Sequence, residues 1–233
     1  MKTLIVTPTT REASALGDRA HAFVCGTGQG ARDSLAARLR TNPPKLVVLA
    51  GYCGGLDPSL GPGSVILGRQ VAKAGRPTLE PDRFLVEDVR NALRNGGLAF
   101  VFAKLLGVDA PVATLDEKRD LWNEHGAAGV DMETYQAVSA CVEARIKWLA
   151  VRVVIDGAGQ SLPSSLREWA QDGDERAIGR RSARHPSEWP GYVRLGMTYP
   201  RARAALKQAT VRTVRAAAGA RNVETLDLLE VTR

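Results

Sequence analysis

Short hydrophobic runs alternate along the chain with longer segments in which hydrophobic residues recur at helical spacing. The clearest runs are Leu46–Ala50 and Lys147–Ile155, the second of which is followed by Asp156. Unbroken runs of this kind are typical of strands that are covered on both faces of a sheet. Further strands are predicted at Lys2–Thr7, His21–Cys25, Ser64–Leu67 and Ala99–Phe102.

The segments between these strands predict helices. Leu35 and Leu39 are four residues apart and therefore lie on one helical face, and Pro43 and Pro44 end that helix. The last helix is predicted to begin at Pro200, because a proline in the first turn removes no hydrogen bond that the helix needs. The remaining helices are predicted at Arg11–Leu16, Arg83–Arg94, Leu115–Glu124 and Glu133–Ala144, and the last one at Pro200–Ala218.

The alternation of strands and helices predicts an α/β fold. We expect a single-domain, mostly parallel or mixed central sheet that is flanked by helices. A length of 233 residues suits one such domain, and no repeat or linker divides the chain. Residues 1–233 are therefore predicted to form one domain, with a helical and basic C-terminal part at about 160–233.

Composition narrows the class of protein further. The N-terminal segment lacks the features of a signal peptide, and no stretch approaches the roughly 20 hydrophobic residues of a spanning helix. Cys25, Cys53 and Cys141 are odd in number and form no C-x-x-C pair, which argues against a disulfide framework or a zinc site. We therefore expect a cytoplasmic protein without a bound metal.

The chain carries a formal charge of +7, from 32 basic and 25 acidic residues. The excess does not form a basic block with interleaved aromatic residues, so no nucleic-acid partner is expected. Basic residues do gather in the C-terminal third, in the run Arg176–Arg184 and at Arg194, Arg201 and Arg203. This region is predicted to form a solvated helix face; peripheral contact with an anionic membrane, or with an anionic substrate, is the alternative.

Three glycine-rich or acidic segments follow predicted strands. They are Gly26–Gly30, the predicted turn Gly51–Gly55, and Asp156–Gly159. In open α/β sheets ligands bind beyond the carboxyl ends of the strands, so these segments predict a pocket. The first also matches a dinucleotide-binding pattern, but the acidic residue expected after the next strand is missing. A tight structural turn that binds no cofactor explains the glycines of this segment equally well.

Four carboxylates near these strand ends are candidates for acid–base chemistry: Glu12, Asp131, Glu133 and Asp156. Each of them alone could equally cap a helix or remain solvated. Arg152 lies inside the hydrophobic run, where an unpaired cation would be costly. It therefore needs either a salt-bridge partner or an anionic ligand.

Taken together, these segments resemble the superfamily of purine nucleoside phosphorylases and methylthioadenosine/adenosylhomocysteine nucleosidases. The resemblance covers most of the chain and implies a nucleoside phosphorylase-like fold and an oligomeric assembly of identical subunits. It is carried by Glu12, Cys25–Gly28, Ala50–Gly63, Val130–Glu133 and Val151–Asp156. The Gly-Gly-Leu-Asp-Pro-x-Leu and Val-Asp-Met-Glu segments are its most specific parts in combination.

The resemblance implies cleavage of the N-glycosidic bond of a purine nucleoside, by hydrolysis or phosphorolysis. Asp156 would be the acid that protonates the departing base, and apolar surroundings would keep it protonated. Glu12 and Arg152 would position the nucleophile, which is water or inorganic phosphate as a co-substrate. Substrate binding would involve Glu133 at the ribose hydroxyls, Met132 against the sugar, and Tyr52, Cys53 and Gly54 beside the base and sugar.

Two departures from the family pattern concern the nucleophile and the base. Many relatives have a small hydroxyl residue at the position of Tyr52, and Ser at the position of Ile155. Within the superfamily, Leu162-Pro163 and His185–Leu195 resemble the hopanoid-associated branch, which implies adenosylhopane as substrate and ribosylhopane as product. A methylthioadenosine/adenosylhomocysteine nucleosidase and a non-catalytic nucleoside-binding module are the alternatives.

Overall fold

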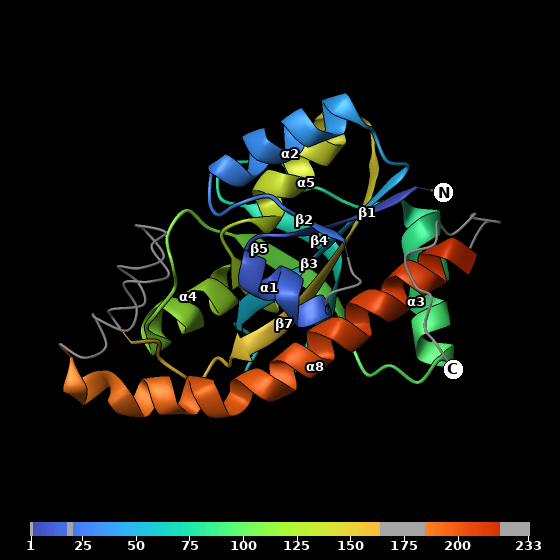
Figure 1. Ribbon diagram of the computed structural model, residues 1–233. Helices are drawn as coiled ribbons and strands as arrows, with labels where there is room; N and C mark the ends of the chain where they lie inside the picture. Colours follow the sequence, from blue (N-terminus) through green and yellow to red (C-terminus); the bar gives the residue numbers. More distant parts are fainter. Residues whose placement is uncertain (1, 18–20, 164–184, 220–233) are drawn as a thin grey trace.

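The computed structural model describes residues 2–17, 21–163 and 185–219 (Figure 1). The strands are β1 (Thr3–Thr7), β2 (Ala22–Val24), β3 (Leu46–Gly55), β4 (Val65–Lys73), β5 (Val101–Gly107), β6 (Gly129–Asp131) and β7 (Lys147–Asp156). The helices are α1 (Thr10–Leu16), α2 (Gly30–Thr41), α3 (Arg83–Asn95), α4 (Leu115–His125), α5 (Thr134–Glu143), the short 3-10 helix η1 (Pro186–Glu188) and α8 (Trp189–Gly219).

The strands form one mixed sheet in the order β2-β1-β3-β6-β5-β4-β7. A further pairing joins β3 to β7, so the five strands β3, β6, β5, β4 and β7 close into a ring. Pairing is parallel between β1 and β3 and between β3 and β7, and it is antiparallel between β4 and β7. The predicted α/β domain with a mixed sheet and flanking helices is confirmed.

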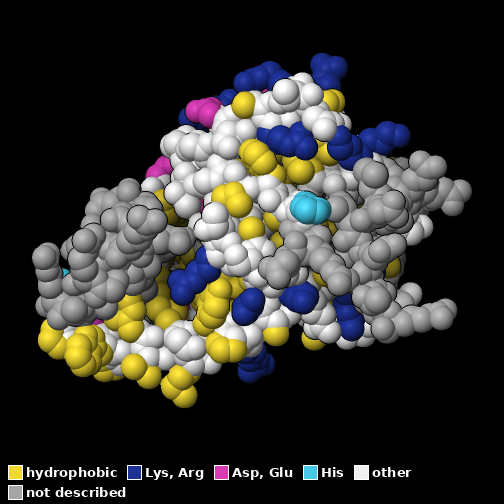
Figure 2. All heavy atoms as spheres, in the orientation of Figure 1, with side chains coloured by type: hydrophobic (Ala, Val, Ile, Leu, Met, Phe, Trp, Pro, Cys, Tyr) yellow, Lys and Arg dark blue, Asp and Glu magenta, His cyan; other side chains and the backbone are white. Residues whose placement is uncertain are grey.

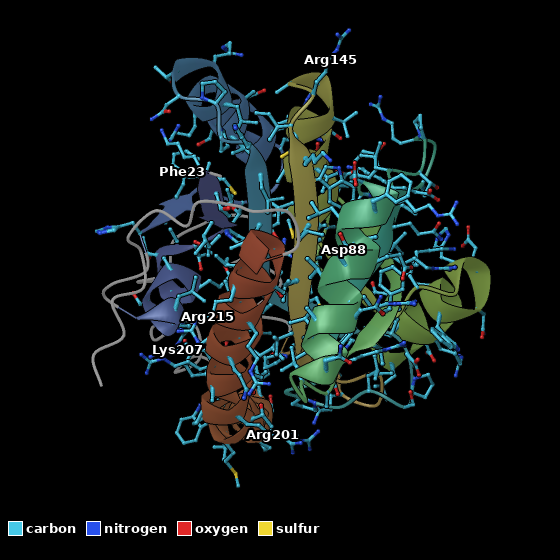
Figure 3. The ribbon with its side chains drawn as sticks, turned by 90° about the vertical axis from the view of Figure 1, so that its right-hand side faces the viewer. Phe23, Asp88, Arg145, Arg201, Lys207 and Arg215 are labelled. Atoms are coloured by element: carbon cyan, nitrogen blue, oxygen red, sulfur yellow. The ribbon has the colours of Figure 1, made fainter. Side chains whose placement is uncertain are left out.

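Helices cover the sheet on both faces (Figure 1). On one face α2 and α5 pack together, and their buried residues Leu35, Leu39 and Val138 belong to one hydrophobic core. On the other face α1, α3 and α8 cover a second core, which includes Leu16, Val89 and Leu206. Figure 3 shows α3 and α8 running side by side across this face.

The central strand β3 is twice as long as predicted. Gly51–Gly55 were predicted to turn away from the sheet, and this was wrong, because β3 stays paired with β7 from Leu46 to Gly54. A strand paired on both sides obtains its stability from backbone hydrogen bonds as well as from hydrophobic side chains. Its glycine-rich half therefore remains in the sheet and leaves space for neighbouring side chains.

Three other strands also differ from the prediction. The predicted strand Ser64–Leu67 covers only the start of β4, which continues to Lys73. The predicted strand Ala99–Phe102 overlaps β5 only at its start, since β5 continues to Gly107. The strand β6 was not predicted at all, because its three residues are too few to show a period. It lies between β3 and β5 and closes the ring.

The C-terminal helix begins earlier than predicted. α8 starts at Trp189, so Pro200 lies in its interior and not in its first turn. A proline inside a helix removes one backbone hydrogen bond and crowds the carbonyl four residues earlier, which here belongs to Gly196. α8 bends along its length, as a proline inside the helix leads us to expect (Figure 1).

Part of the basic C-terminal region, including Arg176–Arg184, lies outside the described residues. Within the described ranges, no helix combines the length and the hydrophobicity needed to cross a membrane.

Candidate active site

Arg152 lies at the centre of a buried polar cluster at the end of the sheet. Its side chain is 1% exposed, and its Nε donates to Thr134 Oγ1 at 2.7 Å and lies 2.9 Å from Asp131 Oδ2. Asp131 also accepts hydrogen bonds from the backbone N–H groups of Glu133 (3.0 Å) and Thr134 (2.6 Å). Asp131 thus fixes both the guanidinium and the start of α5.

The charge of Arg152 is secured by its neighbours. Burial alone would lower the pKa of the guanidinium, but Asp131, Glu12 and Glu133 together raise it above its ordinary value. The sequence left open whether Arg152 has a salt-bridge partner or an anionic ligand. Asp131 is that partner for Nε, whereas Nη1 is buried and has no hydrogen-bond partner among the described residues.

Gly51 provides the space in which Arg152 and Glu12 approach each other. A Cβ atom at this position would lie 2.0 Å from Arg152 Nη1 and 2.6 Å from Glu12 Oε1. Gly51 and Arg152 are paired residues of β3 and β7, so both are held by the sheet. A guanidinium nitrogen and a carboxylate oxygen therefore both lie over a residue that has no side chain.

Glu12 is held by the start of α1. Its Oε2 accepts from Thr9 N (3.0 Å) and Thr9 Oγ1 (2.8 Å) in a capping box, and its Oε1 accepts from Tyr52 N (2.8 Å). A carboxylate can accept about four hydrogen bonds, so one position remains for a further donor. Burial raises the pKa of Glu12, against the opposing effect of Arg152.

Glu133 joins the glycine turn after β2 to the start of α5. Its Oε1 accepts a hydrogen bond from Gly28 N at 3.3 Å. Gly26 and Gly28 have φ values of +87° and +56°, which non-glycine residues rarely adopt, and this explains the glycine turn without a cofactor. Burial, the charge of Asp131 and other neighbours raise the pKa of Glu133 to about 7.

Asp156 ends β7 and is 3% exposed. We expected apolar surroundings, but its Oδ2 forms an ion pair with Lys118 of α4, which is fully buried. Burial raises the pKa of Asp156 and Lys118 lowers it, with a net rise to about 6. The pKa of Asp156 is therefore raised, in the direction that we expected. Its surroundings, however, contain a cation and are not apolar. At neutral pH the carboxylate form predominates.

No sequence pattern pointed to Lys118. It lies in the charged stretch Asp116–Asp120 of α4, where neighbouring charged side chains are exposed or partly exposed and no hydrophobic pattern marks an inward-facing position. Its role depends on where α4 meets the end of β7, which is a tertiary contact.

Only some of the predicted substrate-binding residues have side chains or backbone beside the buried carboxyl groups. Gly54 lies beside Asp156, whose Oδ2 would be 3.5 Å from a Cβ there, and Met132 is partly exposed before Glu133. The side chains of Tyr52 and Cys53 point to opposite faces of β3. The Tyr52 ring lies 5.9 Å from that of Tyr199 on α8.

The Cys53 thiol is buried in the core, where a Cβ at Gly129 would lie 2.9 Å from its Sγ. Burial raises the pKa of this thiol well above its ordinary value, so it is an unreactive packing group. A contact of Tyr52 and Cys53 with base and sugar would therefore involve their backbone groups. Of these groups, the Tyr52 N–H already donates a hydrogen bond to Glu12.

Comparisons with known proteins agree with this architecture. A nucleosidase for 5'-methylthioadenosine/S-adenosylhomocysteine from Neisseria meningitidis is 16% identical, with a TM-score of 0.70 over 93% of this chain and 100% of that one. The corresponding nucleosidase from Colwellia psychrerythraea is 15% identical, with a TM-score of 0.67 over 94% and 95%. Futalosine hydrolase of Helicobacter pylori is 12% identical, with a TM-score of 0.63 over 81% and 96%.

At these identities the solved structures establish the fold alone. A search of curated protein sequences gives no match. The family profile described as the phosphorylase superfamily matches residues 9–185, which is most of the chain. The chain therefore belongs to the phosphorylase superfamily.

Proposed function

We propose that this protein cleaves the N-glycosidic bond of a purine nucleoside and releases the base. The observation that carries the proposal is the position of Asp156, a buried carboxyl whose pKa is raised to about 6, at the strand end beside Gly54. A buried acid that titrates near neutral pH is suited to proton transfer. Membership of the phosphorylase superfamily supports the same reaction type.

The other buried groups suit the charges that develop in this reaction. As the C–N bond breaks, its electron pair moves to the base and positive charge develops on the sugar. The protonated form of Asp156, which is the minor form at neutral pH, would transfer its proton to the base nitrogen. Glu133 would accept hydrogen bonds from the ribose hydroxyls. Met132 precedes Glu133 and would lie against the sugar.

The nucleophile would be held between Glu12 and Arg152. Nη1 of Arg152 is a buried donor without a described partner, and Glu12 Oε1 lies against the same glycine. A water molecule would accept from Nη1 and donate to Glu12. Hydrogen phosphate would make the same two contacts, because its unprotonated oxygens accept and its P–OH group donates. The raised pKa of Glu12 is compatible with either nucleophile.

One assay separates these reactions. The purified protein is incubated with a panel of purine nucleosides, with and without inorganic phosphate, and the liberated base and the sugar product are quantified. We expect base release in at least one arm, with free ribose or ribose 1-phosphate identifying the nucleophile. Tight binding of a nucleoside without base release would instead support the non-catalytic binding module.

For the 5′ group we propose a bulky hydrophobic substituent, as in adenosylhopane, which would yield ribosylhopane. The observation that favours it is an apolar stripe on the first half of α8, formed by Trp189, Val193 and Met197, which are 55%, 61% and 77% exposed (Figure 2). Pro163, a few residues after Asp156, packs against Gly191 and so connects the site to this half of α8.

The structural relatives favour a second candidate. Two of those named above are nucleosidases for 5'-methylthioadenosine and S-adenosylhomocysteine. Small 5′-thio nucleosides would therefore be the substrates if the α8 stripe has another role. Comparing kcat/KM for 5'-methylthioadenosine with that for an adenosine bearing a long 5′-alkyl chain decides between the two candidates.

A further inference from the structure

Lys118 is the one lysine in the described ranges that is fully buried. Its Nζ forms the ion pair with Asp156 Oδ2 and also donates to Gly157 O at 2.9 Å and to Gln160 O at 2.7 Å. Three acceptors match the three N–H groups of an ammonium, so this lysine is charged. No donor remains for a substrate.

The same contacts fasten α4 to the turn that follows β7. Gly157 N donates to the Gln160 side chain at 2.9 Å, and Leu162 N donates to Ala113 O at 2.8 Å. Lys118 therefore contacts both the carboxyl group of Asp156 and the backbone carbonyls that follow it in the chain. Of the two carboxyl oxygens, Oδ2 is held by the lysine, whereas no other described side chain donates to Oδ1.

We propose that Lys118 is a positioning residue that fixes Asp156 through Oδ2, presents Oδ1 to the departing base, and holds the carboxyl in its charged form more firmly than burial alone would. This inference rests on the proposed glycosidic cleavage for the role of Oδ1. From the sequence we expected apolar surroundings to keep Asp156 protonated. Lys118 instead stabilises the carboxylate form of Asp156 before substrate binds.

Few other charges act on this carboxyl. Among the described residues that pack around it, the charged or titratable neighbours are Lys118 from α4 and the neutral thiol of Cys53 from β3. Gly54 and the Gly157–Gln160 turn contribute backbone groups. Removing the cation therefore leaves burial as the dominant effect, and burial favours the protonated acid.

Lys118→Gln tests the proposal, because glutamine keeps hydrogen-bond donors and loses the charge. The readout is the pH dependence of kcat/KM for base release, whose alkaline limb reports the loss of the proton from Asp156. We expect that limb to move to higher pH by roughly one unit or more in Lys118→Gln. In Lys118→Arg, which keeps a cation, the limb should stay near its wild-type position while kcat falls.

An alkaline limb that stays in place or moves to lower pH in Lys118→Gln would overturn the proposal. If Lys118→Gln does not fold, Lys118→Arg still decides, because a limb displaced to higher pH in that variant contradicts the role of the charge. Carbon-13 NMR titration of the Asp156 carboxyl in the free protein, assigned with Asp156→Asn, gives the same comparison without an assay. It therefore separates failure of this inference from failure of the proposed reaction.

Discussion

At the residue scale, Gly51 matters because of the side chain that it lacks. The guanidinium of Arg152 and the carboxylate of Glu12 both occupy the position that a Cβ would need. Arg152 is fixed by Asp131 and Thr134, and Glu12 is fixed by Thr9 and Tyr52 N–H, so neither can move away easily.

We therefore predict that Gly51→Ala disrupts the cluster. The free energy of unfolding should fall by about 1–3 kcal/mol, as for other overpacked cores, and any base release should fall sharply. Denaturant unfolding measures the first effect. Gly61→Ala is the matched control, because a Cβ at Gly61 meets nothing within 4 Å. Equal stability of the two variants would contradict the packing described for Gly51.

Glu133 gives a pH-dependent prediction. Its pKa is about 7 in the folded protein and 4.5 as the ordinary value, so the folded state binds more protons between these values. The contribution of Glu133 to stability is therefore complete below about pH 4.5 and is lost as pH rises through 7.

In Glu133→Gln this decline should be smaller, by on the order of 2 kcal/mol after allowing for partial exposure. Unfolding free energies of both proteins at several pH values from 4.5 to 8 measure the difference, and Asp156, which is not among the charges that act on Glu133, contributes equally to each curve. Parallel curves would show that Glu133 is not a buried acid.

The residues of the site were predictable where a strong pattern marked them. A charged residue within a hydrophobic strand marked Arg152, and a position at the end of that strand marked Asp156. Lys118 and the partnership of Asp131 with Arg152 had no such pattern, because both depend on contacts between elements that are distant along the chain.

At the scale of elements, α8 is attached to the sheet by a regular buried stripe. The stripe recurs at helical spacing and its residues are fully buried: Ala202, Leu206, Ala209 and Thr213. On the same helix Arg201, Lys207 and Arg215, which are labelled in Figure 3, are all exposed. The stripe therefore provides the contact by which α8 covers the second core.

Leu206→Ala should lower the free energy of unfolding by about 2–5 kcal/mol, because it leaves a cavity in a fully buried position. Gln208→Ala, at an exposed position of the same helix, should change it by less than about 0.5 kcal/mol. Denaturant unfolding of the two variants measures the difference. A loss below about 1 kcal/mol for Leu206→Ala would mean that α8 is loosely attached.

Elements with a long hydrophobic period were predicted well, as β7 and α3 show. The glycine-rich half of β3 was not, because glycines signal turns locally and its pairing with β7 is a property of the whole sheet. The start of α8 was predicted wrongly at Pro200 for a similar reason. Packing of α8 against the sheet outweighs the local cost of an interior proline.

At the scale of the whole molecule, a net charge of +7 occurs together with the exposed apolar stripe of α8. Basic and apolar groups on one helix suit the surface of an anionic membrane, which was the alternative considered for the C-terminal part. A second copy of the chain could cover the same stripe, as expected for a homo-oligomer.

We predict that the protein sediments with anionic vesicles at low salt, and that the triple variant Trp189→Ser, Val193→Ser, Met197→Ser does so several-fold less. Release at high salt should accompany binding, because charge screening weakens it. Retention of the wild type in the soluble fraction at low salt would exclude membrane contact. Sedimentation velocity of both proteins would then show whether the stripe joins two copies.

The most direct test of the proposed chemistry is base release by Asp156→Asn relative to the wild type. Both proteins should have matching circular dichroism spectra, so that a loss of activity reports chemistry and not unfolding. We predict a decrease in kcat of roughly 100- to 10,000-fold, the range for loss of a general acid. Unchanged turnover in Asp156→Asn would contradict the assignment of this carboxyl as the proton donor.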